Sequence, residues 1–399
     1  MSHLDILQKL VEFPTYMPDG MRGCAEFISN ELSKAGFTVV VDKLNNVYGS
    51  KEFALGNGTF LINSHFDTVA PSAKWTRDTL RVTMEGDRLY GLGTADAKGG
   101  VAAILHVLED LDRCRFRRLE VLLSSYEDSR AILDGEQWLG TPYFLAHNRL
   151  EAKTGINVEG TVQGDRFMVS LGCGGRVRFG VTTIGREAHS AEPSWRTLGH
   201  NAIYDMMKVI EALRRMPPAR MAFDEHETHT QLNVGLIEGG TAVNVVPGEC
   251  KITCERRVLP NEDWDEVKKE VESALRTLRD IDFNVDYSEP QRPYLLDRKD
   301  PAVALAVTSV EQTLGYTPKF RVESGRTDST YLDQLAGIKT VIMGPGEGVA
   351  VEHKPDEYVS AKKIGEFNRI IRYMLTKSPT GDVPMRSASN PGTQKPSIE

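Results

Sequence analysis

The chain has 399 residues, of which 40% are hydrophobic and 26% are charged, and its formal net charge is -8 at pH 7. This length allows two domains with separate cores, and the composition is that of a soluble globular protein. The acidic balance argues against nucleic acid as a partner, because phosphate binding needs a basic face, and no apolar run is long enough to cross a membrane.

Helices and strands alternate along the first part of the chain. Residues 21–36 place apolar side chains at the spacing of one buried helix face and end in a glycine. Strands are expected over 37–41 and 60–63, and the unbroken apolar run of the second predicts a strand covered on both faces. A helix over 99–113 and a strand over 119–125 follow. This order predicts an α/β layered sheet, in which ligands gather beyond the carboxyl ends of the strands.

The pattern changes near residue 175, where apolar and polar residues begin to alternate. The elements expected after this point are a strand over 176–184, a helix over about 198–215, strands near 231–237 and 249–258, and a helix that is capped by Asn261 and runs to about 280. Residues 300–376 return to helix and short strand, with a last helix over 361–375. We therefore expect an α+β unit inserted into the first domain.

This order divides the chain into three parts. The first domain is discontinuous and comprises residues 1–175 and 290–377, whereas the inserted unit comprises residues 176–289. The tail, residues 378–399, has prolines and serines but few apolar residues, and this composition predicts disorder.

The N-terminal segment and the cysteines predict a cytoplasmic protein. Residues 1–8 lack the charged segment and the long apolar run of a secretory signal. The five cysteines are an odd and sparse set without a Cys-x-x-Cys pair, which favours reduced thiols over disulfides or a cysteine zinc site.

Two histidines and several carboxylates stand at strand ends or in turns; they are His65, Asp67, Asp96, Glu127, Asp128, Glu159 and His353. Imidazole nitrogen and carboxylate oxygen together suit zinc, cobalt or manganese, and two metals held close together need a carboxylate that bridges them. Taken alone, Asp96 also fits a helix N-cap and His65 a buried core histidine. Their joint occurrence with the other carboxylates favours a metal site.

The order of these residues is that of a known family. Over roughly residues 4–376 the chain resembles the M20 metallopeptidases, which include acetylornithine deacetylase, succinyl-diaminopimelate desuccinylase, the aminoacylases and the glutamate carboxypeptidases. The most specific pieces are His65-x-Asp67 and the glycine-flanked segment Asp96-x-Lys-Gly-Gly100. The resemblance implies an α/β zinc-peptidase-like catalytic domain with a mixed sheet and flanking helices, and it makes the inserted α+β unit a lid and dimerisation domain.

The resemblance also implies roles for the metal-binding set. The ligands of two divalent ions, Zn2+ or Co2+, would be His65, Asp96, Asp128, Glu159 and His353. Asp96 would bridge both ions and be followed by a cis peptide bond, and Asp67 would steady His65. The usual Asp-Glu-Glu motif reads Tyr126-Glu127-Asp128 here, so we assign Glu127 as the general base and Asp128 as the ligand. Because aspartate is shorter than glutamate, the second metal site is the weaker expectation.

Further residues match positions that contact substrate in the family; they are His189, Asn244, Arg257, Gly325 and Thr327. His189 would reach the active site of a partner subunit, although alone it also fits a histidine in a surface turn. Arg257 has the planar group that clamps a carboxylate, but it also fits an exposed charge at a strand edge. Arg326 is unusual at its position and offers a guanidinium for a second anionic group.

Together these features predict a metal-dependent amide hydrolase for a small carboxylate-bearing substrate. The leading expectation is deacylation of an N-acyl amino acid by a homodimer, and a dipeptidase or carboxypeptidase that acts on a short peptide is the runner-up. A binding protein that keeps the fold without catalysis is the alternative of another class. The departure at Tyr126-Glu127-Asp128 favours it, whereas the retained Glu127 argues against it.

Overall fold

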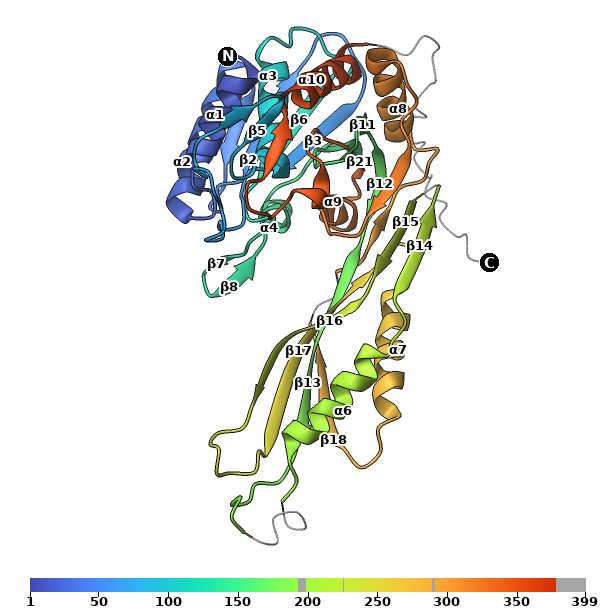
Figure 1. The fold of residues 1–399 in the computed structure, drawn as a ribbon. Helices are drawn as coiled ribbons and strands as arrows, with labels where there is room; N and C mark the ends of the chain where they lie inside the picture. The colour runs from blue at the N-terminus through green and yellow to red at the C-terminus, as the bar shows by residue number, and fades with distance from the viewer. Residues whose placement is uncertain (193–198, 225, 289–290, 378–399) are drawn as a thin grey trace, which may run out of the picture.

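The computed structural model describes residues 1–377 apart from 193–198, 225 and 289–290. The tail over 378–399, for which we expect disorder, lies outside the described residues. In Figure 1 the chain forms a broad layered part and a narrower part of long strands and two helices that extends away from it. No helix in the described ranges is long and apolar enough to span a membrane.

A nine-stranded mixed sheet forms the centre of the broad part. In spatial order its strands are β1 (Thr38–Val41), β2 (Val47–Glu52), β6 (Arg118–Ser124), β3 (Thr59–His65), β9 (Thr154–Asn157), β21 (Lys339–Ile342), β12 (Val169–Cys173) and β19 (Tyr294–Leu295), with β20 (Phe320–Glu323) beside β12. The central strands β6, β3, β9 and β21 run parallel, whereas β1, β2 and β19 pair antiparallel. The carboxyl ends of the central strands therefore share one edge of the sheet.

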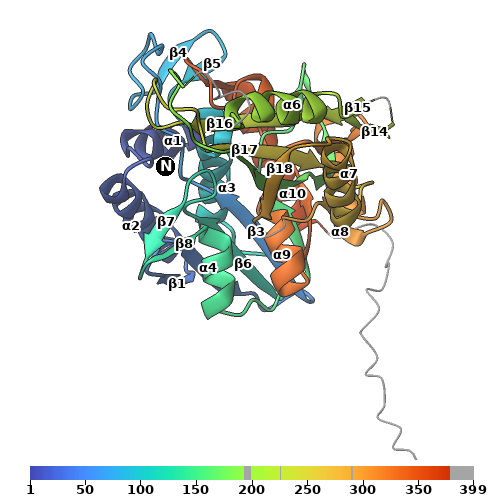
Figure 2. The ribbon, with the colours of Figure 1, turned by 90° about the horizontal axis from the view of Figure 1, so that it is seen from below.

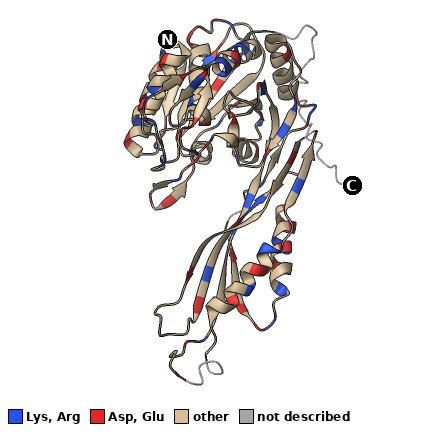
Figure 3. Cartoon of the chain, viewed as in Figure 1, with Lys and Arg blue, Asp and Glu red and all other residues tan. Residues whose placement is uncertain are grey.

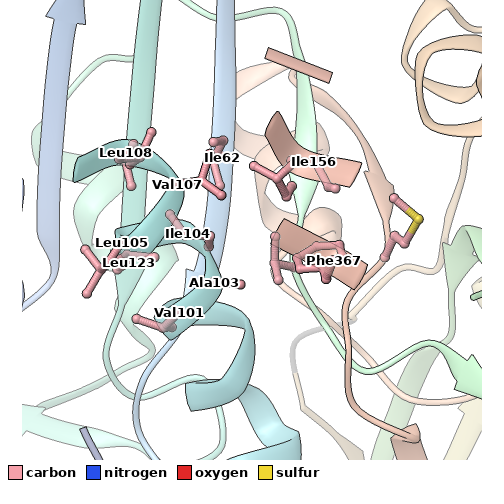
Figure 4. Close-up of a cluster of buried hydrophobic side chains, with 14 of the residues drawn as sticks. Ile62, Val101, Ala103, Ile104, Leu105, Val107, Leu108, Leu123, Ile156 and Phe367 are labelled. Atoms are coloured by element: carbon pink, nitrogen blue, oxygen red, sulfur yellow. The ribbon is translucent and has the colours of Figure 1, made fainter. Parts of the chain in front are cut away.

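Helices cover both faces of this sheet. They are α1 (His3–Glu12), α2 (Pro18–Lys34), α3 (Gly99–Glu109), α4 (Gly140–His147), α8 (Pro301–Leu314), α9 (Ser329–Ala336) and α10 (Ala361–Thr376). Ile62 of β3 packs with α3 and α10 (Figure 4), whereas its neighbour Leu61 packs on the opposite face with Phe144 of α4 and Leu332 of α9. Successive side chains of a strand point to opposite faces, so the unbroken apolar run of β3 satisfies both layers, as expected.

The narrower part is built on a four-stranded antiparallel sheet. Its order is β16 (Leu232–Gly239), β17 (Glu249–Val258), β13 (Gly175–Ile184) and β18 (Asp282–Tyr287). The helices α6 (Ala202–Arg214) and α7 (Trp264–Arg276) lie along one face (Figures 1 and 2), and a second apolar core joins them to the strands. Positive and negative side chains are interspersed along this part (Figure 3).

The cap of α7 differs from the expected one. Asp263, not Asn261, is the N-cap, and its side chain accepts hydrogen bonds from the backbone N–H groups of Asp265 and Glu266. Asn261 instead donates its amide to the backbone oxygen of Arg220. Both residue types suit caps, so the choice depends on a contact with a distant segment.

Short elements complete the fold. They are a three-stranded sheet of β4 (Thr83–Glu85), β5 (Arg88–Tyr90) and β22 (Tyr358–Ser360), the pairs β7 (Ala131–Leu133) with β8 (Glu136–Trp138), β10 (Val162–Gln163) with β11 (Arg166–Phe167) and β14 (Ala219–Phe223) with β15 (His226–Thr230), and the helical turns η1 (Thr94–Lys98) and η2 (Gly348–Ala350). Met221 of β14 packs near Val322 of β20, which ties this hairpin to the large sheet.

Candidate active site

The predicted metal-binding residues follow the carboxyl ends of the central strands. His65 is the last residue of β3, Glu159 comes two residues after β9, and Asp128 lies in the turn after β6. Asp96 lies in η1 before α3, and His353 follows β21 and η2. In a parallel sheet these ends meet at one edge, and this common edge brings residues together that are far apart in the sequence.

Asp96 stands between the two histidines. Its Oδ1 lies 2.9 Å from Nε2 of His65, and its Oδ2 lies 3.1 Å from Nε2 of His353. Glu159 approaches the same nitrogen of His65 at 3.5 Å, and Asp128 approaches that of His353 at 3.2 Å. The Asp96 carboxylate thus belongs to two groups of donors. One group also contains His65 and Glu159, and the other contains His353 and Asp128. This is the donor arrangement that two neighbouring divalent cations require.

The electrostatics of this cluster also favour cations. Burial favours the neutral form of His65, yet Glu159 and Asp96 raise its pKa well above the usual range. Hydrogen bonds that His353 donates to the carboxylates of Asp128 and Asp96 raise its pKa to about 11. Ligand atoms of His65, Asp96 and Asp128 all lie within 4.8 Å of one another, which is close enough to share an ion. The donor set therefore fits hard or borderline divalent metals such as zinc.

Asp67 connects the two sides of the cluster. Its carboxylate lies 3.3 Å from Nδ1 of His65, and it accepts hydrogen bonds from the backbone N–H groups of Glu127 and Asp128. Tyr126, which precedes these residues, has a left-handed φ of 53°. Such a backbone persists in a non-glycine residue only where its surroundings hold it. Asp67 thus orients an imidazole and also fixes the turn that carries Glu127 and Asp128.

The turn at Asp96 depends on a carboxylate to which we had assigned no role. Glu357 accepts hydrogen bonds from the backbone N–H groups of Gly93, Ala95 and Asp96. Burial, with a contribution from Asp96, raises the pKa of Glu357 to about 7. The Asp96–Ala97 peptide bond is cis, as the resemblance implied. In the sequence, the Pro-x-Glu-Tyr segment that contains Glu357 could have indicated a role for this residue. The backbone N–H groups that it binds, however, lie some 260 residues earlier in the chain.

Glu127 lies in the same cleft and is engaged by Arg326. Oε1 of Glu127 lies 2.9 Å from Nη1 of Arg326, and both side chains are buried. Burial raises the pKa of Glu127 well above its usual range; Arg326 opposes this shift, whereas Asp128 and Asp328 add to it. We expected Arg326 to be available to a second anionic group, but in this structure it pairs with Glu127.

The cleft has a volume of about 360 Å³ and is lined by arginines as well as by the carboxylates. The arginines are Arg176, Arg257 and Arg326, and Gly325 and Thr327 also line the cleft. Burial and the neighbouring arginines lower the pKa of Arg176 to about 10. The structure thus places Arg257, Gly325 and Thr327 in the cleft, and it adds Arg176, which had only a strand pattern around it.

His189 and Asn244 lie elsewhere. They are exposed, and they are absent from the residues that line the cleft. His189 follows β13, whose 10 residues start beside the cleft and span roughly 30 Å. His189 comes five residues after the last residue of β13, Ile184, and pairs with Val245. Within one chain, the structure therefore does not bring His189 or Asn244 to the metal-binding set.

Comparison with known proteins agrees with the geometry of the cleft. Residues 61–377 match the peptidase family M20/M25/M40. An acetylornithine deacetylase from Photorhabdus laumondii is 25% identical over 363 residues, which cover 87% of this chain and 88% of that protein. A succinyl-diaminopimelate desuccinylase from a Nitratiruptor species is 26% identical over 385 residues, which cover 94% of this chain and 99% of that protein.

Solved structures share the fold. An M20 family metallo-carboxypeptidase from Sulfolobus solfataricus superposes with a TM-score of 0.75 at 18% identity, covering 94% of this chain and 98% of that one. Human carnosine dipeptidase 1 superposes with a TM-score of 0.70 at 14% identity, covering 93% and 94%. Because the family match spans most of the chain and includes every predicted metal-binding residue, the chain belongs to the peptidase family M20/M25/M40 and is a metal-dependent amidohydrolase.

Proposed function

We propose that the chain removes the acyl group from an N-acyl amino acid, with two divalent metal ions and Glu127 as the general base. The observation that carries this proposal is the position of Asp96, which offers one oxygen to the side of His65 and the other to the side of His353. His65 and Glu159 would complete the first ion's protein ligands, and His353 and Asp128 those of the second. Zinc or cobalt suits this mixture of nitrogen and oxygen donors.

The residues around the cleft suggest how the amide bond is cleaved. Bound divalent cations polarise the scissile carbonyl and make water easier to deprotonate. Glu127 would take the proton from the attacking water and return it to the departing amine. Asp67 keeps the Glu127 turn in place through its two backbone hydrogen bonds. Arg257, Gly325 and Thr327 could hold the free carboxylate of the substrate, since they line the same cleft.

A homodimer would complete the site. Edge strand β16 exposes Leu236 and Ile237, which are 63% and 58% accessible, and α6 exposes Tyr204 and Met207 beside it. An exposed apolar edge strand next to an exposed apolar helix face is typical of a surface that pairs with a second copy. Since His189 lies roughly 30 Å along β13 from the cleft of its own chain, we propose that it acts in the partner's cleft. Asn244 would accompany it and help to stabilise the developing oxyanion.

Two further features support this assignment. The relatives named above are a deacetylase and a desuccinylase, which both remove acyl groups. Arg176 and Arg257, which also line the cleft, suit a substrate that keeps a free carboxylate. All five cysteines are free and buried, which suits a reducing compartment, and we propose the cytoplasm.

Metal analysis combined with a substrate panel tests the proposal. The protein is stripped with a chelator, reloaded with zinc or cobalt, and assayed against N-acetyl and N-succinyl amino acids and against dipeptides. We expect close to two ions per chain and turnover of at least one N-acyl amino acid. Turnover of dipeptides alone would make the chain a dipeptidase. A folded chain that binds substrate without cleaving it would be a binding protein on the same fold.

A further inference from the structure

Arg326 contacts Glu127 at two points. Its Nη1 lies 2.9 Å from Oε1 of Glu127, and its Nη2 donates a 2.7 Å hydrogen bond to the backbone oxygen of the same residue. The Arg326 side chain is 10% exposed and that of Glu127 is 7% exposed. The two residues are 199 positions apart in the sequence, so the contact is made by the fold and not by local geometry.

Arg326 is itself held in place. Its guanidinium lies over the ring of Tyr331, with 5.3 Å to the ring centroid. The hydroxyl of Tyr331 accepts a 2.8 Å hydrogen bond from the side-chain amide of Gln291. A cation over an aromatic ring is attracted to its face, and the ring is fixed by its own hydrogen bond. Gln291 thus fixes Tyr331, the ring of Tyr331 holds Arg326, and Arg326 contacts Glu127.

The Glu127 carboxylate depends on this support. Its backbone N–H is fixed by Asp67, but its buried Oε1 receives no aligned hydrogen bond from any residue that the structure describes. Two other carboxylates, Asp128 and Asp328, are close enough to repel its charge. The guanidinium of Arg326 opposes this repulsion most strongly, and His65 adds a smaller contribution. A negative group among like charges turns away unless an opposite charge holds it.

We propose that Arg326 is a positioning residue, which holds the Glu127 carboxylate toward the reacting water and does not read the substrate. This inference rests on the proposed role of Glu127 as the general base. Two other guanidinium groups, those of Arg176 and Arg257, line the cleft and do not contact Glu127; both pair with Glu255, and they are the arginines that we assign to the carboxylate of the substrate. Arg326 already has the side chain and the backbone oxygen of Glu127 as its partners, so its geometry favours a function that acts through Glu127.

Kinetics of Arg326 variants on the best substrate of the panel test this assignment. We expect Arg326→Ala to lower kcat on the order of 100-fold with KM changed by less than about twofold, because general-base catalysis typically contributes that much or more. Arg326→Lys keeps the charge but loses the planar fork, so we expect a smaller loss of roughly 10-fold. Added guanidinium ion should restore part of the activity of Arg326→Ala, and urea at the same concentration should not.

Arg256→Ala is the matched control. It removes another buried arginine, which pairs with Glu262 at 2.6 Å in the narrower part and contacts the backbone oxygen of Arg257 but not the carboxylates of the cleft. Guanidinium should not raise the activity of this variant. An increase of KM at unchanged kcat in Arg326→Ala would overturn the proposal and assign Arg326 to substrate binding. Equal guanidinium responses in both variants would also overturn it.

A structure of the metal-loaded Arg326→Ala protein supplies a readout that does not depend on activity. We expect the Glu127 carboxylate to move from its wild-type position while Asp67 and Asp128 stay in place. An unmoved carboxylate would overturn the positioning role even if a substrate were found. If the carboxylate moves but the protein cleaves no substrate of the panel, the positioning of Glu127 by Arg326 is confirmed. The proposed function is then rejected instead.

Discussion

Asp96 and Glu127 have different contacts in the site. Asp96 offers its two oxygens to two histidines, so any change to it disturbs both halves of the cluster at once. Glu127 contacts neither histidine and is fixed from behind by Asp67 and Arg326. This separation means that the proposed proton transfer by Glu127 can be removed without removing the residues that fit the metal.

Replacing Glu127 tests that separation. Glu127→Gln keeps the size of the side chain but cannot accept the proton, so kcat should fall on the order of 10²- to 10⁴-fold. Metal content and KM should stay near the wild-type values, because neither depends on the charge of this group. Steady-state kinetics and elemental analysis of the same sample check both statements. Activity near the wild-type level would show that another residue is the base.

Metal binding should release protons. In the absence of cations, the pKa values of His65 and His353 are raised, so both imidazoles carry protons at pH 7. A metal binds the neutral imidazole, and the protons must therefore leave. Affinity should rise as the pH rises from about 6 to 8. Calorimetric titration with zinc in two buffers of different ionisation enthalpy gives the number of protons released, and a value of zero would contradict the cluster.

Much of the fold could be predicted because it depends on local patterns. The bounds of β17 agree with the expected 249–258, and β3 and α10 differ from their expected bounds by a few residues. The cap of α7 could not be predicted, because Asn261 and Asp263 are equally suited and a distant backbone oxygen decides between them.

The candidate site could also be predicted only in part from the sequence. The predicted metal-binding set came from the resemblance of its motifs to a known family, and His65, Asp128 and Glu159 also follow parallel strands whose ends meet at one edge of the sheet. The contact of Arg326 with Glu127 could not be predicted from the sequence. The same is true of the contact of Glu357 with the turn at Asp96. Each depends on how a late loop packs against an early one, and no spacing in the sequence encodes that packing.

Two glycines in different elements should respond in opposite ways to the same substitution. In Gly155→Ala of β9, the added carbon would lie 2.3 Å from the backbone oxygen of Leu61 in β3, so the strands must separate. We expect the free energy of unfolding to fall by about 1–3 kcal/mol. In Gly365→Ala of α10, the added carbon meets no atom within 4 Å, and the free energy should rise by about 0.5–1 kcal/mol. Urea unfolding of both variants measures the contrast, and a destabilised Gly365→Ala would contradict it.

The molecule as a whole is extended, and this shape bears on catalysis. The residues of the cleft belong to the broad part, to the start of β13 and to the end of β17, whereas His189 follows the other end of β13. The narrower part, which contains these strands, extends away from the broad part (Figure 1). A chain that acts alone would leave His189 and Asn244 in solvent. A symmetric pair through β16 and α6 would let each chain contribute to the site of the other.

Complementation tests this arrangement. His189→Ala and Glu127→Ala should each be inactive, yet a mixture that exchanges subunits should recover up to about a quarter of wild-type turnover, because half of the dimers are mixed and each has one intact site. Sedimentation of the mixture provides the control for dimer formation. A strict monomer that still turns over substrate, or no recovery despite proven exchange, would place the function of His189 within its own chain.

The two proposed cation positions differ in their access to water. The side chain of His65 is 2% exposed, whereas that of His353 is 49% exposed. Ligand exchange needs an incoming water or chelator, so an ion beside His353 should leave and re-enter faster than one beside His65. Brief dialysis against a weak chelator would then empty the outer position first and leave a protein with a single, slowly exchanging ion. Reloading that intermediate with a different metal would give a mixed-metal enzyme, in which a spectroscopic probe such as cobalt reports on one position alone.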